Sequence, residues 1–321
     1  GESWQSFQQN LPVTPVTDIK LHRGDLVLST MGRGFWVLDS LATLRQAPWP
    51  ESPDAVTVFH PAETIRYRQG FRNIDPDAVP QYPPASAIID YYLPENAGDS
   101  VQLEVLDLDG NVVNAFRSSI DEQAAPEVVE DMAMNRTRFI EEDTLTAQAG
   151  LNRFHWDMSW RGAWRAPDKD DDGADRYDDG PLAAPGRYTL RMTVGTVSSD
   201  APLILVMDPR VVASGVTAEI ATEQVAFVRR VVDLLDRARR LAAALEEERE
   251  TVTDQNPRAT AIDSALEKLV TAEGTYQLPT LIDQVDYLYD MLKQADQAPG
   301  QDAVERLAVL SEEFAAIEAA L

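Results

Sequence analysis

The sequence predicts a multidomain protein of the β plus α class, with strands in the first two thirds and helices in the last third. Three features predict this arrangement. Residues up to 207 contain runs in which polar and apolar side chains alternate, separated by turn signals. A proline-rich stretch at 47–84 divides these runs. After residue 215 the apolar residues recur at the three- and four-residue spacing of a packed helix. The length of 321 residues suits two or three domains.

The first part, residues 1–46, reads as a three-stranded meander. One strand ends at a turn at 23–25, the next ends at a turn at 32–34, and the third covers 35–38. Strands as short as these do not bury enough apolar surface to be stable alone. We therefore expect them to belong to a larger β structure.

The middle of the chain predicts a connector followed by a β-sandwich. Residues 47–84 contain eight prolines and read as an extended connector laid over a surface. Residues 85–207 then alternate polar and apolar side chains, most clearly at 101–105 and 186–194. Asp109–Gly110 is a strong hairpin signal between two such runs.

Two insertions interrupt the predicted sandwich. The first, at 122–148, is acidic and has a helix-like pattern. The second, at 165–181, contains an aspartate-rich loop at 168–179. We expect both insertions to leave the alternating strands on either side of them intact.

Residues 215–321 predict four helices with short connections. Thr217 suits the N-cap of the first helix, and Asn256 before a proline suits the N-cap of the second. We expect the third helix to begin near Pro279. The fourth carries the apolar seam Val304, Leu307, Leu310, Phe314, Ile317 and Leu321. Such helices form an antiparallel up-and-down bundle or a pair of helical hairpins.

The composition excludes several classes of function. The chain has 54 acidic and 28 basic residues, a net charge of −26, so its field repels the phosphate backbone of nucleic acids. It has no cysteine, which rules out disulfides, cysteine-ligated zinc and thiol catalysis. No apolar run reaches the ~18 residues that a membrane helix requires. The acidic, lysine-poor composition suits saline or extracellular surroundings, and a simple solubility device is the alternative.

Several stretches together resemble one protein family. Gly1–Glu2–Ser3–Trp4 is similar to the second half of an Asp-box, the BNR repeat of β-propellers. The stretch GDLVLSTMGRGFWVLDS, at 24–40, resembles the closing propeller blade of sortilin-like BNR-repeat proteins, with Ser40 where the family often has a second aspartate. AIIDYYLPE at 87–95 resembles the first sandwich strand after that propeller. LEVLDLDGNVV, GLNRFHWDM and PLAAPGRYTLRMTV resemble an Ig-like sandwich.

The resemblance implies a domain order. Residues 1–46 would be the partial last blade of a propeller, 85–207 an Ig-like β-sandwich and 215–321 the helical tail. We then expect the chain to be the tail of a larger secreted, periplasmic or extracellular bacterial protein. The family is often labelled glycosyl hydrolase, but a propeller site is built from many blades at the centre of the ring. One partial blade does not carry it, so we assign no catalytic residue and lean against an enzyme.

The second insertion contains a candidate calcium loop. Asp168, Asp170, Asp172 and Gly173 follow the D-x-D-x-D-G pattern, and position 12 of the loop falls on Asp179. Alternate carboxylates on a turning loop supply the hard oxygen ligands that Ca²⁺ takes, and they repel one another without a cation. A solvated acidic loop is the alternative. Ca²⁺ is the one cofactor that the sequence suggests.

Three tryptophans form a weaker candidate. Trp156, Trp160 and Trp164 recur every four residues and would offer an aromatic platform for sugars. On a strand, however, Phe154, Trp156 and Met158 share a face, which favours packing. Likewise, the arginines and acidic residues at 229–250 indicate either a solvated helix face or a helix that docks a partner.

Three functions follow from these observations. The first is a non-catalytic module that supports a BNR/sortilin-like propeller and makes protein–protein or assembly contacts, with upstream propeller blades or another chain as its partner. The second is an accessory segment of a sialidase-like glycoside hydrolase, with its catalytic residues upstream of residue 1. The third is a calcium-stabilised sandwich that binds carbohydrate. None of them involves nucleic acid or a membrane span.

Overall fold

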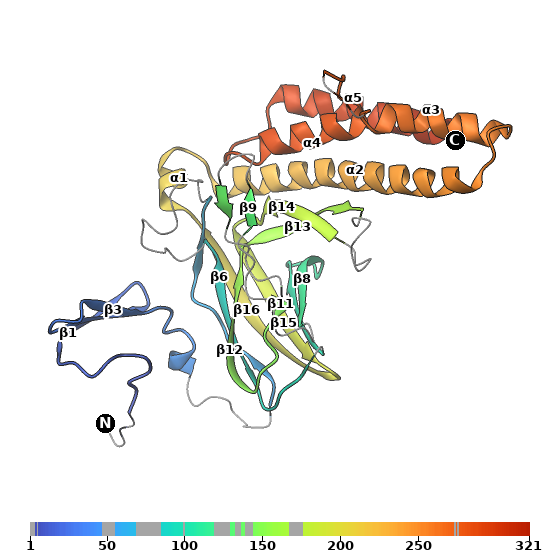
Figure 1. Cartoon of the computed structure of the whole chain (residues 1–321). Helices are drawn as coiled ribbons and strands as arrows, with labels where there is room; N and C mark the ends of the chain where they lie inside the picture. Colours follow the sequence, from blue (N-terminus) through green and yellow to red (C-terminus); the bar gives the residue numbers. More distant parts are fainter. Residues whose placement is uncertain are drawn as a thin grey trace.

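The computed structural model describes residues 4, 6–46, 55–68, 85–98, 100–118, 144–166, 176–272, 274 and 276–321, and the backbone of 129–131 and 136–138. The fold is mixed β plus α, with sheets in most of the chain up to residue 207 and a helical region after it (Figure 1). None of the helices in these ranges combines the length and apolarity that a bilayer crossing requires.

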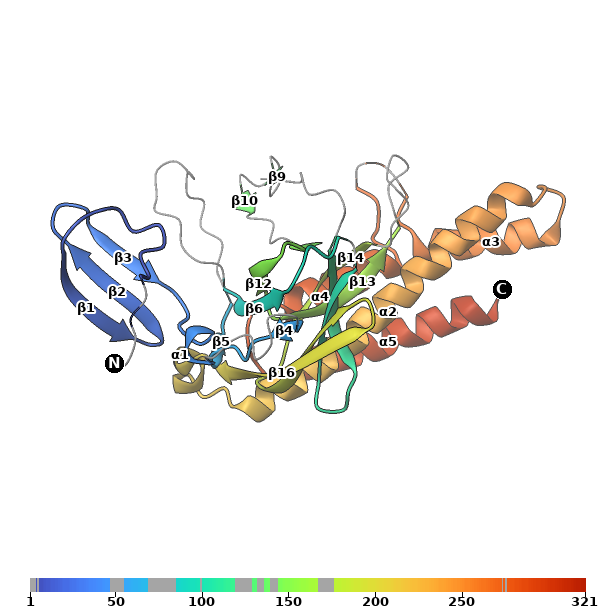
Figure 2. The same cartoon turned by 90° about the horizontal axis from the view of Figure 1, so that it is seen from below.

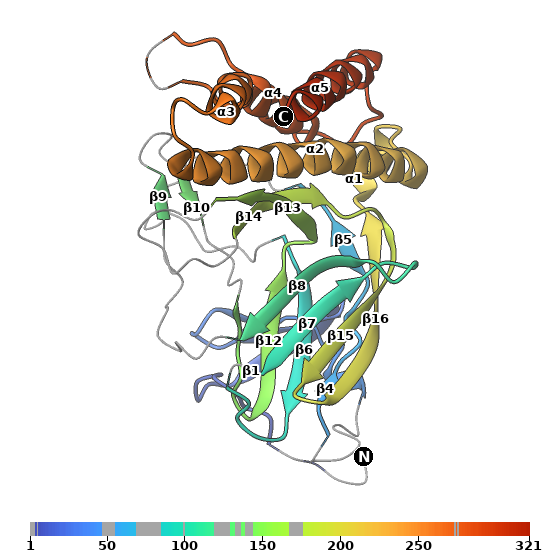
Figure 3. The ribbon, with the colours of Figure 1, turned by 90° about the vertical axis from the view of Figure 1, so that its right-hand side faces the viewer.

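Two sheets enclose the first apolar core. The larger one curls (Figure 3) and has the order β11 (Thr144–Leu145), β8 (Val112–Ser118), β7 (Val101–Leu106), β15 (Gly186–Val194), β16 (Val197–Met207) and β5 (Thr64–Arg66). Its two outermost pairs are parallel and the others antiparallel. The facing sheet is antiparallel, with the order β12 (Gly150–Trp156), β6 (Ala87–Leu93) and β4 (Thr57–Val58).

The apolar side chains of the alternating runs in the sequence point into this core. Val101, Leu103 and Val105 of β7 are all buried, and Leu190 and Met192 of β15 face them from the next strand. β6 contributes four fully buried side chains at alternate positions, Ala87, Ile89, Tyr91 and Leu93. In β7 and β15 the period-two pattern therefore indicated the buried side chains, whereas β6 does not alternate in sequence and also buries Asp90.

A further hairpin lies between this core and the helices. It consists of β13 (Ser159–Arg165) and β14 (Arg176–Leu182). The end of the predicted acidic loop at 168–179, residues 176–179, belongs to β14 instead. Two glycines allow the strands to approach closely. A Cβ on Gly162 would lie 2.1 Å from the carbonyl oxygen of Asp178, and one on Gly180 would lie 2.1 Å from that of Trp160.

The helical prediction for the first insertion is also wrong where the structure describes it. β9 (Val129–Asp131) and β10 (Arg136–Arg138) form a short antiparallel pair. The other residues between 119 and 143 lie outside the described part of the chain. Acidic and long side chains give a helix-like local pattern, but strand pairing depends on a partner segment that such a pattern does not contain.

The C-terminal region begins with α1 (Pro209–Ala213) and the long helix α2 (Ala218–Thr251), followed by α3 (Pro257–Leu269), α4 (Leu281–Leu292) and α5 (Gln301–Ala319). The two predicted N-caps are confirmed, because the side chains of Thr217 and Asn256 accept the N–H groups of Ile220 and Arg258. The third predicted helix, α4, begins two residues after Pro279. Four residues of the predicted seam in α5 are buried: Leu307, Leu310, Phe314 and Ile317.

Helices α3 and α4 lie one after the other along α2, and α5 lies beside them (Figures 1 and 3). Arg249 near the end of α2 pairs with Asp263 of α3 at 2.7 Å, whereas Gln224 near its start donates to the carbonyl of Leu292 in α4 at 3.0 Å. Helices α3 and α4 therefore follow one another, antiparallel to α2. Arg237 pairs with Glu318 at 2.8 Å, so that α5 returns in the direction of α2.

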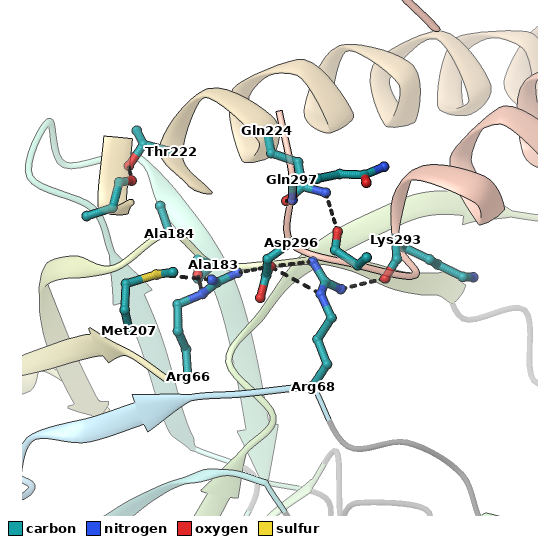
Figure 4. Close-up of polar contacts among 12 residues, drawn as sticks. Arg66, Arg68, Ala183, Ala184, Met207, Thr222, Gln224, Lys293, Asp296 and Gln297 are labelled. Carbon is teal, nitrogen blue, oxygen red and sulfur yellow. Dashed lines mark hydrogen bonds and ion pairs between the residues drawn. The ribbon is translucent and has the colours of Figure 1, made fainter. Parts of the chain in front are cut away.

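A buried polar cluster fastens the helices to the sheets (Figure 4). Asp296, in the connection between α4 and α5, accepts from Arg66 at 3.1 Å and from Arg68 at 3.0 Å. Arg66 also donates to the carbonyl of Ala183, and Gln224 holds the carbonyl of Ala295. The connection is thereby joined to β5 on one side and to α2 on the other.

The N-terminal residues form a separate small sheet at one end of the molecule (Figure 2). Its strands are β1 (Val16–His22), β2 (Asp25–Thr30) and β3 (Phe35–Leu38), as the meander pattern predicts, and a short 3-10 helix, Leu44–Gln46, follows them. The β1–β2 turn has positive φ at both central residues, 50° at Arg23 and 93° at Gly24, which is typical of a two-residue hairpin. The remaining described residues are called the body below.

Candidate interaction surface

The N-terminal sheet carries apolar side chains on both faces. The strand register aligns Ile19 with Leu28 and Trp36, and aligns Leu21 with Leu26 and Leu38. Residues in register share a face, so we call these six side chains the Trp36 face. On the opposite side, which we call the Phe35 face, Lys20 aligns with Val27 and Val37, and Ser29 aligns with Phe35.

Neither face is covered by the described part of the chain. Exposure is 60% for Ile19 and 64% for Leu21 on the Trp36 face, and 79% for Phe35 and 60% for Val37 on the Phe35 face. No residue of this sheet belongs to either apolar core of the described residues. An exposed cluster of this kind is typical of a surface that contacts another protein.

The outer edge of β1 is protected against pairing with a further strand. Lys20 and Asp18 form an ion pair at 3.7 Å, and the register shifts between Val16 and Asp18. The Ile19 N–H points away from β2, because Ile19 and Leu28 form a pair without ladder hydrogen bonds. It donates instead to the carboxylate of Asp18 at 2.9 Å. Charged residues and bulges disfavour pairing at the β1 edge, and the two faces are candidate contact surfaces because their apolar side chains are exposed.

A short tether joins the sheet to the body. On the sheet side, Ser40 N–H donates to the Asp25 carboxylate at 2.9 Å, and Leu41 N–H donates to the Gly24 carbonyl at 2.8 Å. On the body side, Gln46 donates to the carbonyl of His60 at 2.8 Å and accepts its N–H at 2.9 Å. Residues 39–46 are therefore held at both ends.

Arg153 completes this attachment. Its Nε donates to Asp90 Oδ1 at 2.8 Å, and its Nη1 donates to Asp39 Oδ1 at 2.7 Å. Thr43 of the tether donates to the other oxygen of Asp90 at 2.6 Å. The hydrogen bonds that Arg153 donates to Asp90 raise the pKa of Arg153, so its guanidinium stays charged.

Charge also distinguishes the sheet from the rest of the chain. Residues 1–46 contain four acidic and four basic residues, so the net charge of −26 belongs entirely to residues 47–321. A partner of the sheet therefore has no need of a strongly basic surface, whereas a partner of the body would gain from one.

The predicted calcium loop is only partly described. Asp168, Asp170 and Asp172 lie outside the described residues, and Asp179 lies in β14. Its neighbour Asp178 is paired with Arg165 at 3.2 Å and with Arg239 at 2.5 Å. Within the described ranges, no group of three or more histidines or carboxylates is placed to hold a metal. Calcium binding stays a prediction of the sequence.

The three tryptophans are buried. Exposure is 0% for Trp156, 8% for Trp160 and 9% for Trp164. The guanidinium of Arg229 lies 3.6 Å from the centre of the Trp160 ring, and that of Arg240 lies 4.8 Å from the Trp164 ring. Protein atoms thus occupy ring faces that a sugar platform would need open, and this favours the packing interpretation.

The arginines of α2 are engaged within the chain. Arg237 pairs with Glu318 of α5, and Arg239 pairs with Asp178 of β14 and with Asp286 of α4. Together with the stacking on the tryptophans, these contacts place α2 between the β13–β14 hairpin and the other helices. The basic part of α2 therefore binds its own fold, and this favours an internal role over the docking of a partner.

Two hollows on the described surface do not resemble a reaction site. One of about 200 Å³ lies between α2 and α5, and one of about 410 Å³ lies beside Arg68 and Asp296. Each lining includes a charge pair, Arg237 with Glu318 in the first hollow and Arg210 with Asp208 in the second. Charges neutralised in this way offer little to a bound cofactor.

Comparison with protein-family models, curated proteins and solved structures finds no match. The resemblance of 24–40 and 87–95 to BNR/sortilin-like proteins therefore stays a prediction from the sequence. The attachment by Arg153 and the two-sided apolar sheet were not foreseen. Alternation in 16–38 was a signal for the sheet, but the assignment of side chains to two faces required the strand register.

Proposed function

We propose that this chain is a non-catalytic support and assembly module whose N-terminal sheet docks against β-sheets of a larger protein. The observation that supports this most strongly is the exposure of apolar residues on both faces of that sheet, with Phe35 at 79% and Leu21 at 64%. Water contact with this much apolar surface is unfavourable, and a partner on the faces removes it.

The resemblance specifies the partner. In a BNR/sortilin-like protein, residues 1–46 would be the last blade of a propeller, and a blade is covered on both faces by its neighbours. The body would then be an Ig-like sandwich with a helical tail that supports the end of the ring. Secretion, and the propeller blades as partner, belong to this proposal.

The carbohydrate-binding alternative has less support. It depends on open faces of Trp156, Trp160 and Trp164, all of which are less than 10% exposed. The hydrolase-accessory alternative places this same sheet at the edge of an upstream site, so it also requires the sheet to be covered by other blades. Docking of the sheet is thus the step to test first.

Hydrogen exchange provides the test. Amides of β1 to β3 are measured in the isolated chain and in the protein purified from its natural source. We expect at least tenfold slower exchange for these amides in the source protein, because docking excludes solvent from the sheet. Equal rates in the two samples would refute the proposal.

Matched variants sharpen this test. Leu21→Asp alters the Trp36 face and Phe35→Asp alters the Phe35 face, and each should remove the additional protection. Val13→Asp is the control, because Val13 is 93% exposed and lies outside the strands. It should leave the protection unchanged.

A further inference from the structure

We infer that Arg153 is a positioning residue that holds the N-terminal sheet in one orientation on the body. Arg153 belongs to β12 of the body, and Asp39 follows directly after the last strand of the sheet. Among the ion pairs of the described residues, Arg153–Asp39 is the one that joins the sheet and its tether to the body. The Arg153–Asp39 pair therefore sets the orientation of the two apolar faces relative to the body.

The two acidic partners of Arg153 have different roles. Asp90 lies opposite Arg153 in the β12–β6 register, and its side chain is only 3% exposed. That contact is internal to the body and fixes the direction of the guanidinium. Asp39 is 44% exposed and belongs to the tether. The ion pair between Arg153 and Asp39 can therefore break while the contact between Arg153 and Asp90 stays intact within the body.

The surrounding contacts limit the motion that results. Thr43 and Gln46 attach the far end of the tether, through Asp90 and His60. Ser40 and Leu41 attach the near end to the sheet. Asp39 lies at the junction, so the loss of its bond to Arg153 allows the sheet to pivot while the tether stays attached.

This arrangement matters for docking, and in that respect it rests on the proposed function. A sheet held in one orientation loses less conformational freedom on binding than one on a loose linker, so binding is tighter. Because the Arg153–Asp39 pair is partly exposed, salt screens it, with a Debye length of about 8 Å at physiological ionic strength falling to about 3 Å at 1 M. High salt therefore loosens the sheet.

The absence of cysteine makes the orientation directly measurable. Cysteines introduced by Lys20→Cys in β1 and Glu223→Cys in α2 take a pair of spin labels, and pulsed electron spin resonance reports the distribution of distances between them. Asp39→Asn removes the negative charge that the tether presents to Arg153 and leaves Arg153 paired with Asp90. The matched control is Asp200→Asn, because Asp200 forms a similarly exposed pair with Arg191 at 2.9 Å within the body.

We expect one narrow distance distribution in the parent and in Asp200→Asn, and a distribution at least twice as wide in Asp39→Asn. About 1 M NaCl should widen the parent distribution toward that of Asp39→Asn. Unchanged thermal unfolding in all three proteins would show that the body is intact. A distribution that stays narrow in Asp39→Asn, or one already wide in the parent at low salt, would overturn the inference.

The result is independent of any partner. If Asp39→Asn widens the distribution but the sheet gains no protection in the source protein, the positioning role holds and the docking function fails. If protection is gained while the distribution stays narrow in Asp39→Asn, docking holds and the role of Arg153 fails.

Discussion

The guanidinium of Arg66 and the carboxylate of Asp296 form an ion pair of 3.1 Å in which the side chains are 0% and 3% exposed. The two residues are 230 positions apart in the sequence, one in β5 and the other in the α4–α5 connection. Burial lowers the pKa of Arg66, and Asp296 opposes this effect. The pair therefore depends on both partners being present.

Loss of the Asp296 carboxylate should strongly destabilise the fold. Asp296→Ala leaves Arg66 as an uncompensated buried charge, so we expect a loss of about 3–5 kcal/mol in the free energy of unfolding. Urea unfolding followed by circular dichroism measures it. Asp254→Ala serves as the control, because Asp254 is 81% exposed in its pair with Arg249 and should cost less than about 1 kcal/mol. Equal losses in the two variants would contradict a special role for the buried pair.

The close approach of β13 and β14 predicts a position where only glycine fits. In Gly162→Ala the new methyl group would lie 2.1 Å from the Asp178 carbonyl oxygen, so the strands must separate. We expect a loss of about 3 kcal/mol or more in the free energy of unfolding. Gly195→Ala is the comparison, since its φ is 57° but nothing lies within 4 Å, and its cost should stay near 1–2 kcal/mol. Thermal unfolding of both variants shows which of them loses more stability. A larger loss in Gly195→Ala than in Gly162→Ala would show that the strands do not approach this closely.

Stability should fall in strongly alkaline solution because of buried tyrosines. Burial raises the pKa of Tyr188 to about 12, whereas an unfolded tyrosine titrates near pH 10. Between these values the unfolded chain has lost the proton and the folded chain keeps it. Stability is therefore complete below about pH 10 and falls as the pH rises toward 12. The shift corresponds to about 3 kcal/mol.

Tyr188→Phe tests this assignment. At pH 8 the variant should be less stable by about 1 kcal/mol, because the hydroxyl donates to the Ala184 carbonyl at 2.7 Å. Between pH 10 and 12 it should lose less stability than the parent, with the remaining loss due in part to Tyr289, whose pKa burial also raises. Urea unfolding at several pH values measures both effects. An identical alkaline slope in parent and variant would rule out Tyr188 as the source.

Added salt should stabilise the body. Residues 47–321 carry the whole net charge of −26, and this produces self-repulsion, which mobile ions screen. We expect the Tm to rise by several degrees between about 0.05 and 0.5 M NaCl. Calorimetry in NaCl and in KCl measures it, and the two salts should act alike if screening is the cause. A falling Tm would mean that the ion pairs lost to screening outweigh the repulsion that it relieves.

The sequence was most informative where structure depends on local patterns. Alternation at 101–105 identified buried strand positions, and the caps at Thr217 and Asn256 located two helix starts. It failed where a distant partner decides the structure. The acidic run at 176–179 has little strand propensity, yet it pairs with β13, because glycines permit the approach and Arg239 neutralises Asp178.

Prediction of the candidate surface from the sequence was likewise limited, because the surface depends on contacts between residues that are distant in the sequence. The sequence identified three strands in 1–46, but which side chains share a face depends on register, and a shift of one residue exchanges the faces. Arg153 alternates with core residues and looks like any solvated strand position. Only its proximity to Asp39 and Asp90, 114 and 63 residues away, reveals its role.

The uneven charge noted for the N-terminal sheet makes the two ends of the molecule electrically different. Residues 1–46, which contain the sheet at one end, carry no net charge, and residues 47–321 carry all of the −26 (Figure 1). Near any anionic surface, such as a polysaccharide coat or a lipid headgroup layer, the acidic end is repelled most strongly. The molecule would then rotate so that its uncharged end leads. Within about one Debye length of the surface, ~8 Å at physiological ionic strength, this repulsion would favour orientations in which the sheet faces it.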